Sequence, residues 1–568
     1  MKNWHGISAE LSSYQKQLEQ GWRQLSEQEI VDRIWRKDHT VWKESPHEIT
    51  NRLGWLDSPR LMKSAVSDIN SFINELHAEG FTQALLLGMG GSSLAPEVFS
   101  KTFESEKAGI ALKVLDSTDP GAVLEKARFA RSGKTIFIVS TKSGGTVETI
   151  SFMKYFYRMI ADSYGSAGAG DFFTAITDAG SGLESMARAL KYRKIFINNP
   201  EIGGRYSALS YFGLVPAALT GVDIDKLLER ADELAQKTRH GSDDSAAALG
   251  VIMGTLALLG RDKVTLKLTS GVRYFGSWIE QLIAESTGKE GKGILPVDSE
   301  PPVQTDYYGP DRLFVYIKLQ NETDYDRDFG NIAAAGHPVI ELALQDKYDL
   351  GSEFFRWELA TVIAGYFLKI NPFDQPNVEA AKVLAREQLT TYKDTGNLPK
   401  SGEGIFAGGI NYIGSGSGKT APEILRNFFS RIKRQAHGSY ISIQAYLNPD
   451  DQMQRLLGKL QSLLLKKFRV AVTIGFGPRY LHSTGQLHKG DAGNGLFIQL
   501  IAQTKTDASI PDEATGAASS VSFGVLRDAQ SLGDRQALID AGRAVLRIEL
   551  TDDYLSEIDN LIKHMEGV

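Results

Sequence analysis

The sequence predicts an α/β fold in which open, mainly parallel sheets are flanked by helices and an additional α/β unit forms the C-terminal part. Short apolar or β-branched runs alternate with longer segments of helical periodicity, which is the pattern of strand–helix repeats. The runs show little polar alternation, as expected for parallel strands covered on both faces. With 568 residues, the chain is also too long for one ordinary hydrophobic core, so we expect several packed units.

Residues 1–60 are predicted as a helical lead-in, because apolar residues recur at helical spacing between Leu11 and Leu18. Three series of strands follow, and they divide the rest of the chain into units at 61–225, 226–395 and 396–568. The expected strands are 84–88, 112–116, 135–140, 172–177 and 195–198 in the first unit, 264–268, 313–317 and 338–342 in the second, and 440–444, 470–474 and 496–500 in the third.

Three other segments carry a structural expectation of their own. The Gly- and Ser-rich segment 394–424 is predicted as a linker or surface loop. The apolar stretch 246–259 falls short of the roughly 20 residues that span a bilayer, so it is predicted as a buried helix. The basic run 431–435 is expected to be a solvated helix face without a function.

Composition excludes several classes of function. The formal net charge is -6, with acidic and basic residues interspersed, so the chain lacks the positive field that gathers nucleic acid. The absence of cysteine excludes disulfides, thiol catalysis and thiolate metal sites, and it fits a cytoplasmic protein. The first residues lack the pattern of a signal peptide. We therefore expect a cytoplasmic protein without nucleic-acid or membrane partners.

A glycine-rich turn, residues 87–96, follows a predicted strand and opens a helix. Its glycines allow a ligand to approach the backbone closely, while free N–H groups and the helix dipole face an anion. Gly91 and Ser92 are the candidate ligands. The turn matches neither the Walker pattern nor the dinucleotide fingerprint, and a purely structural turn remains an alternative.

A second turn, residues 140–149, follows the third strand of the same unit and is rich in hydroxyl groups. Thr141, Ser143 and Thr146 could bind a phosphate monoester through hydroxyls and amides, and Lys142 would add a positive charge. A Ser/Thr helix cap with an ordinary loop lysine would explain any one of these residues. It explains both turns together poorly, because neighbouring parallel strands bring their carboxyl ends into one crevice.

The two turns resemble the phosphate loops of sugar isomerase (SIS) domains, and residues 203–207 (Gly-Gly-Arg-Tyr-Ser) resemble a signature of the glucose-6-phosphate isomerase family. The resemblance implies SIS domains at 61–225 and 226–395, a homodimer, and reversible isomerisation of glucose 6-phosphate and fructose 6-phosphate without a metal or organic cofactor. The arrangement of motifs looks most like the isomerase half of bacterial transaldolase/glucose-6-phosphate isomerase fusions.

Aldose–ketose isomerisation needs a base, a cation for the enediolate and groups that open the sugar ring. Residues 281–289 resemble the family segment that carries the base, which implies that Glu285 is the base, with Gln281 one helical turn away. By the same resemblance Arg205 stabilises the enediolate. Residues 371–382 resemble the segment that bears the ring-opening lysine, Lys382, and a phosphate-side glutamine, Gln375. A solvated glutamate and a structural ion pair are the alternatives for Glu285 and Arg205.

The histidine departs from the family order, because none follows Glu285 before His337. Residues 480–490 resemble the histidine helix of the family and lie beyond the lysine, so we expect the third unit to deliver His482 to the Glu285 site. Catalysis depends on spatial proximity and not on chain order. His488, six residues later, is expected to be structural, because the spacing puts the two rings on different helix faces.

Three alternatives remain open at this point. The substrate could be mannose 6-phosphate or an aminosugar phosphate, because pocket shape decides specificity. The same turns could serve a non-catalytic sugar-phosphate sensor, although Glu285, Arg205 and Lys382 together argue against it. The residues also leave open whether His482 acts within its own chain or across a subunit interface, and what residues beyond about 505 contribute.

Overall fold

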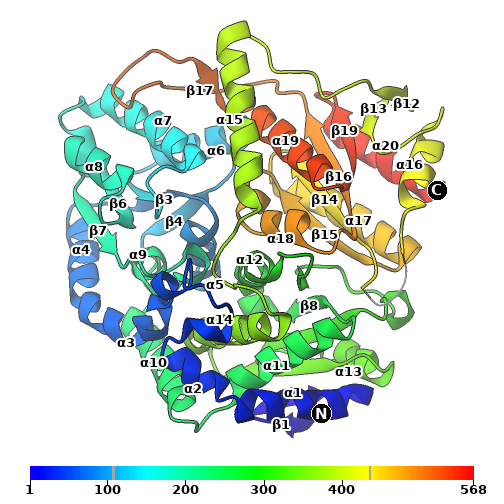
Figure 1. Cartoon of the computed structure of the whole chain (residues 1–568). Coiled ribbons are helices and arrows are strands. Elements are labelled where there is room, and N and C mark those ends of the chain that lie inside the picture. The colour runs from blue at the N-terminus through cyan, green and yellow to red at the C-terminus, as the bar shows by residue number, and fades with distance from the viewer. Residues whose placement is uncertain (105–108, 434–436) are drawn as a thin grey trace.

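The computed structural model describes residues 1–104, 109–433 and 437–568, so the last residues of the basic run 431–435 lie outside the described residues. In these parts of the chain the strands form a five-stranded sheet, two six-stranded sheets and a two-stranded ribbon. Figure 1 shows the three large sheets as separate layers with helices around them, the second sheet lying below the other two. Every strand expected from the sequence overlaps a strand of the structure, which confirms the predicted α/β class.

The first sheet is parallel throughout, with the strand order β4-β3-β5-β6-β7. Its strands are β3 (Gln83–Gly88), β4 (Ala111–Leu115), β5 (Thr135–Ser140), β6 (Phe173–Asp178) and β7 (Lys194–Asn198). The accompanying helices are α3 (Ser58–Leu61), α4 (Val66–Ala78), α5 (Leu94–Thr102), α6 (Pro120–Arg131), α7 (Val147–Tyr164), α8 (Gly182–Ala189) and α9 (Tyr211–Leu219). β3 and β5 are neighbours and pair Gly88 with Ser140, so the turns that follow them begin side by side.

The second sheet contains the parallel strands β8 (Lys263–Leu268), β9 (Leu295–Val297), β10 (Arg312–Leu319) and β11 (Val339–Leu344). Its helices are α10 (Ile224–Arg239), α11 (Ser245–Leu258), α12 (Phe275–Thr287), α13 (Asp326–Ala334), α14 (Leu350–Leu368) and α15 (Val378–Thr395). α11 covers the apolar stretch 246–259 and is buried along nearly its whole length, as predicted. Among the described residues, no helix is long and apolar enough to cross a bilayer.

The N-terminal segment corrects one prediction. It contains α1 (Gln15–Glu27) and α2 (Ile30–Trp35), but it begins with β1 (Lys2–Trp4) and β2 (Ile7–Glu10). β2 pairs antiparallel with β11 and extends the second sheet. Ile7 and Ala9 are buried, whereas Ser8 and Glu10 are only partly buried, which is the period-two pattern of a strand. The expected helical lead-in is therefore wrong for residues 2–10.

The third sheet has the order β12-β13-β19-β16-β14-β15. The parallel strands are β14 (Tyr440–Tyr446), β15 (Ala471–Phe476), β16 (Gly495–Ala502) and β19 (Ala544–Leu550), and the helices are α16 (Ala421–Phe429), α17 (Asp451–Phe468), α18 (Gly485–Gly490), α19 (Phe523–Asp540) and α20 (Tyr554–Glu566). The ribbon is formed by β17 (Ser509–Ile510) and β18 (Val521–Ser522). The expected linker 394–424 is corrected, because it contains the hairpin β12 (Ile405–Ala407) and β13 (Ile410–Gly414), whose strand β13 pairs with β19.

Candidate functional site

The site is formed where the first turn meets the backbone of two distant segments. Gly90 has a φ of 54°, a left-handed conformation that favours glycine. A Cβ on Gly90 would lie 2.8 Å from the carbonyl oxygen of His482, and one on Gly91 would lie 2.0 Å from that of Gly204. Ser92 is buried directly after them. The glycines therefore allow a close backbone approach that a side chain would prevent.

The second turn is held together by its own hydroxyl groups. The Oγ1 atoms of Thr141 and Thr146 lie 3.0 Å apart, and the amide of Gly145 donates to Ser143 Oγ at 3.3 Å. Lys142 is engaged at this edge of the sheet, because its ammonium pairs with the Asp178 carboxylate and donates to the carbonyl of Pro200 at 2.8 Å. The lysine predicted to bind phosphate thus holds neighbouring loops together in this structure, and its phosphate role stays a prediction.

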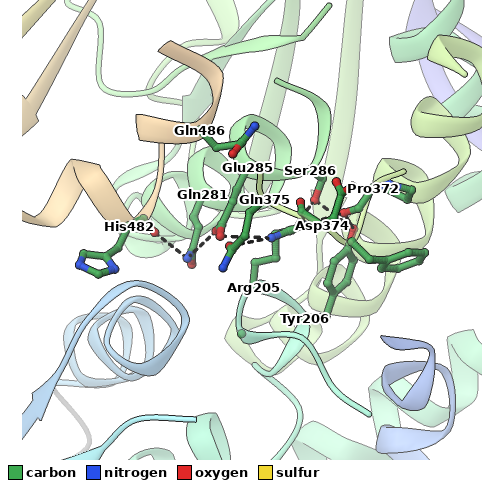
Figure 2. Close-up of polar contacts among 12 residues, drawn as sticks. Arg205, Tyr206, Gln281, Glu285, Ser286, Pro372, Asp374, Gln375, His482 and Gln486 are labelled. Carbon is green, nitrogen blue, oxygen red and sulfur yellow. Dashed lines mark hydrogen bonds and ion pairs between the residues drawn. The ribbon is translucent and has the colours of Figure 1, made fainter. Parts of the chain in front are cut away.

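Arg205 occupies the centre of the site (Figure 2). It lies on the short 3-10 helix η8 (Gly204–Tyr206) and is only 4% exposed. Its Nε donates to Ser286 Oγ at 2.8 Å, and its Nη2 donates to the carbonyls of Pro372 at 2.8 Å and Asp374 at 3.0 Å. These fixed acceptors hold the guanidinium plane, so its Nη1 is presented in one orientation.

Nη1 of Arg205 faces the predicted base. It lies 3.2 Å from Glu285 Oε1 and donates to Gln375 Oε1 at 3.4 Å. Glu285 lies on α12, one turn after Gln281, whose Nε2 donates both to Glu285 Oε2 at 3.0 Å and to the carbonyl of His482 at 2.8 Å. One carboxylate is therefore held by a cation on one oxygen and an amide on the other, and the structure brings Arg205, Gln281, Glu285 and Gln375 together.

Lys289 and Tyr206 contact the segments that surround Arg205. Lys289, which is 1% exposed, donates to the carboxylate of Asp374 at 2.7 Å. Burial and the positive charge of Arg205 lower the pKa of Lys289 to about 8. Burial raises the pKa of Tyr206 to about 12, and its hydroxyl lies 3.0 Å from Ser286 Oγ. Both residues fix the segments that hold Arg205.

The His482 imidazole points away from Glu285, whereas its backbone carbonyl faces Gln281 (Figure 2). The ring nitrogen Nε2 lies 3.0 Å from Glu148 Oε1, at the start of α7 in the first unit. Burial raises the pKa of Glu148, but the charge and hydrogen bond of His482 and the charge of Lys382 outweigh it and leave the pKa below its ordinary value. The third unit thus delivers His482 to the first unit within one chain.

Lys382 lies on α15, and its ammonium is 3.8 Å from the Glu379 carboxylate. Its side chain is 43% exposed, and its charge contributes to lowering the pKa of Glu148. His488 is buried among aromatic rings, and burial lowers its pKa well below the ordinary value, in agreement with a structural role.

Glu148 was missed as a site residue, although it lies within the hydroxyl-rich turn, residues 140–149. An acid in the first turn of a helix has an ordinary explanation in the helix dipole, so nothing local distinguished it. Its burial at 4% exposure next to His482 and Lys382 is the distinguishing feature, and only the folded chain shows it.

Residues 61–294 match the family described as phosphoglucose isomerase. The matched segment contains both turns, Arg205, Gln281 and Glu285. This match covers less than half of the chain. The other candidate residues, Gln375, Lys382 and His482, lie beyond the matched segment.

The chain is similar to several proteins that are named glucose-6-phosphate isomerase. The chain is 29% identical over 390 residues to a glucose-6-phosphate isomerase of Carboxydothermus hydrogenoformans, which covers 58% of this chain and 83% of that protein. It is 27% identical over 431 residues to one of Prochlorococcus marinus, covering 69% of this chain and 81% of that protein. A solved glucose-6-phosphate isomerase of Chlamydia trachomatis shares the fold, with a TM-score of 0.57, 18% identity and coverage of 66% of this chain and 86% of that one.

The fold places a carboxylate, a guanidinium and an amide at one point beside two hydroxyl- and amide-rich turns. A carboxylate held in this way can move a proton, and an adjacent fixed cation can stabilise an oxyanion. The imidazole held by Glu148 can exchange protons on a second side of the site.

Proposed function

We propose that the protein is a glucose-6-phosphate isomerase, which interconverts glucose 6-phosphate and fructose 6-phosphate through an enediolate. The observation that carries this function is the Glu285 carboxylate, 3.2 Å from the fixed guanidinium of Arg205 and bonded to Gln281. The match of residues 61–294 to the phosphoglucose isomerase family and the names of the relatives support the same reaction.

In the proposed mechanism, the turns at 87–96 and 140–149 bind the phosphate of the sugar. Gly91, Ser92, Thr141, Ser143 and Thr146 contribute amides and hydroxyls, and Lys142 is the predicted charge at this end. The backbone approach of Gly90 and Gly91 to the segments of His482 and Gly204 supports this placement, because it connects the turns to the reacting groups.

His482 and Lys382 open the sugar ring by moving a proton from the anomeric hydroxyl to the ring oxygen, and Glu148 orients the imidazole. Glu285 then removes the proton from C2 of the open-chain aldose. The electron pair forms the enediolate, whose developing negative charge Arg205 stabilises. Glu285 returns the proton to C1 while a proton moves from O2 to O1, which gives the ketose with no net change in atoms or electrons.

Replacing Glu285 with Gln tests the base. We expect turnover in a coupled assay to fall by about 10³-fold, while calorimetry still detects binding of fructose 6-phosphate, because the amide keeps the shape of the side chain. Glu290→Gln is the matched control, since Glu290 is exposed and pairs with Lys43. Near-normal turnover in Glu285→Gln would mean that another group is the base.

The finer expectations also belong to this proposal. A panel with mannose 6-phosphate and aminosugar phosphates tests specificity, and turnover of these but not of glucose 6-phosphate would replace the proposed substrate. We propose SIS domains at 61–225 and 226–395 with a C-terminal unit at 396–568, and a cytoplasmic homodimer. Light scattering tests the homodimer, and cell fractionation tests the cytoplasmic location. The His482–Glu148 contact lies within one chain, so this contact does not require the second copy.

A further inference from the structure

A glutamine of the C-terminal unit contacts the histidine end of the site. Gln530 lies on α19 and is 4% exposed. Its Nε2 donates to Glu148 Oε1 at 2.6 Å, and its Oε1 accepts from Thr118 Oγ1 at 2.8 Å. A carboxylate oxygen can only accept, so the amide nitrogen must face Glu148 and the amide oxygen must face the hydroxyl. Thr118 therefore fixes which way the amide of Gln530 points.

The same oxygen of Glu148 faces the His482 ring. Oε1 receives the amide of Gln530 at 2.6 Å and lies 3.0 Å from Nε2 of His482. Because an ionised carboxylate can only accept, Nε2 carries a proton in this contact, and in the neutral imidazole Nδ1 is then the acceptor. A chain of hydrogen bonds thus runs from Thr118 through Gln530 and Glu148 to His482.

The helix that carries Gln530 is anchored at the same place. Arg527, one turn earlier on α19 and 3% exposed, donates from Nη1 to Asp119 Oδ2 at 3.0 Å and from Nη2 to the carbonyl of Ala502 at 2.8 Å. Thr118 and Asp119 are consecutive residues, so two neighbouring side chains of the first unit hold two residues of α19 one turn apart. This double attachment holds α19 against the start of α6, and the Gln530–Glu148 contact joins α19 to the start of α7.

We propose that Gln530 is a positioning residue of the isomerase site: it holds the Glu148 carboxylate in the place where that carboxylate fixes the orientation and tautomer of the His482 imidazole. This inference rests on the proposed function. It gives a role to part of the chain beyond residue 505, for which the sequence offered none. The charged or titratable groups that face Glu148 are His482 from the 3-10 helix η12 (Arg479–His482), Lys382 from α15 and Tyr446 from β14.

Two substitutions of Gln530 separate positioning from packing. Gln530→Met keeps the length of the side chain but removes the donor, and we expect kcat to fall by about 10-fold with KM changed by less than about 2-fold. Gln530→Glu places a second carboxyl against Glu148, and two such groups share a proton with a raised pKa. As pH falls, that proton restores a donor, so kcat of Gln530→Glu relative to the wild type rises, whereas the ratio for Gln530→Met stays level.

Gln536→Met is the matched control, because Gln536 lies on the same helix, is exposed and donates to Asp540 at 2.7 Å. It should leave kcat and the pH profile unchanged. Wild-type kcat and pH profile in both Gln530 variants would overturn the proposal, as would a loss of activity in Gln530→Met that matches the loss of folded protein by circular dichroism. If Gln530→Met does not fold, Thr118→Val frees the amide of Gln530 instead and should lower kcat in the same direction.

A readout that does not depend on turnover separates this inference from the proposed function. In protein labelled with ¹⁵N-histidine, the Nε2–H signal of His482, assigned by its loss in His482→Asn, should exchange with water faster in Gln530→Met than in Gln536→Met. Equal exchange in these two variants would overturn the role of Gln530 even in an active enzyme. A wild-type protein without isomerase activity would instead refute the proposed function and leave this measurement valid.

Discussion

Glu280→Gln is expected to stabilise the protein at alkaline pH. Glu280 lies on α12 next to Gln281, and Ser483 Oγ lies 3.5 Å from its carboxylate. Burial and the negative charge of Asp298 raise the pKa of Glu280 to about 8, although the charge of Arg479 opposes the rise. Arg479 is shared with other acids, since it pairs with Glu97 and lies 3.2 Å from Asp116. The positive charge of Arg479 therefore does not fully offset the cost of ionising Glu280 in the folded protein.

The magnitude follows from the two pKa values of this group. A folded-state pKa of about 8 against an ordinary value of 4.5 means that the folded protein binds more protons between these values. The free energy of unfolding therefore falls as pH rises through this window. The shift of about 3.5 units corresponds to an upper bound of about 5 kcal/mol at 1.36 kcal/mol per unit. Because Glu280 is only partly buried, solvent screening reduces the expected effect to about 2 kcal/mol.

Urea unfolding at about pH 5 and about pH 8.5 measures this effect. Glu280→Gln and the wild type should have similar midpoints at the lower pH, and the variant should be the more stable one at the higher pH. Glu229→Gln, at an exposed position of α10, serves as the control and should follow the wild type. A difference between Glu280→Gln and the wild type that does not grow with pH would refute the reasoning.

Three other substitutions test the site. Arg205→Lys should lower kcat/KM by about 10²-fold in the coupled assay, because an ammonium cannot replace the planar set of donors; a loss below about 3-fold would contradict the oxyanion role. Glu148→Gln should lower kcat by at least about 10-fold, since a neutral amide holds the imidazole less well, and unchanged kcat would exclude this pairing from the mechanism. Gly91→Ala should lower the free energy of unfolding by about 2 kcal/mol, because its Cβ would meet the Gly204 carbonyl, and wild-type stability in denaturant would contradict that close approach.

The strands were predictable from the sequence because most of them are buried on both faces and read as continuous apolar runs, such as Thr135–Ser140. Most of the strands that were missed are short, but β19 is seven residues long and lies between β13 and β16. β2 spans four residues, and the hairpin of β12 and β13 lies in a segment rich in glycine. In such short segments, pairing with β11 or β19 decides the conformation, and that partner is far away in the sequence.

Some contacts of the candidate site could be predicted from the sequence, and others could not. The contacts among Arg205, Gln281 and Glu285 were accessible because each residue stands in a recognisable local motif. The partner of the His482 ring was not, because an acid at a helix start looks ordinary. Gln530 gave no signal at all, since it meets Glu148 across 382 positions of the chain. Only the packing of α19 against the first unit creates that contact.

Glu148 and His482 belong to the same chain, which has a consequence for how the site assembles. Both side chains belong to one polypeptide, and their contact at 3.0 Å forms when the first and third units fold against each other. The local concentration of the imidazole is therefore set by the fold and does not change when the protein is diluted. Each copy of the chain therefore pairs its own Glu148 with its own His482 at any protein concentration.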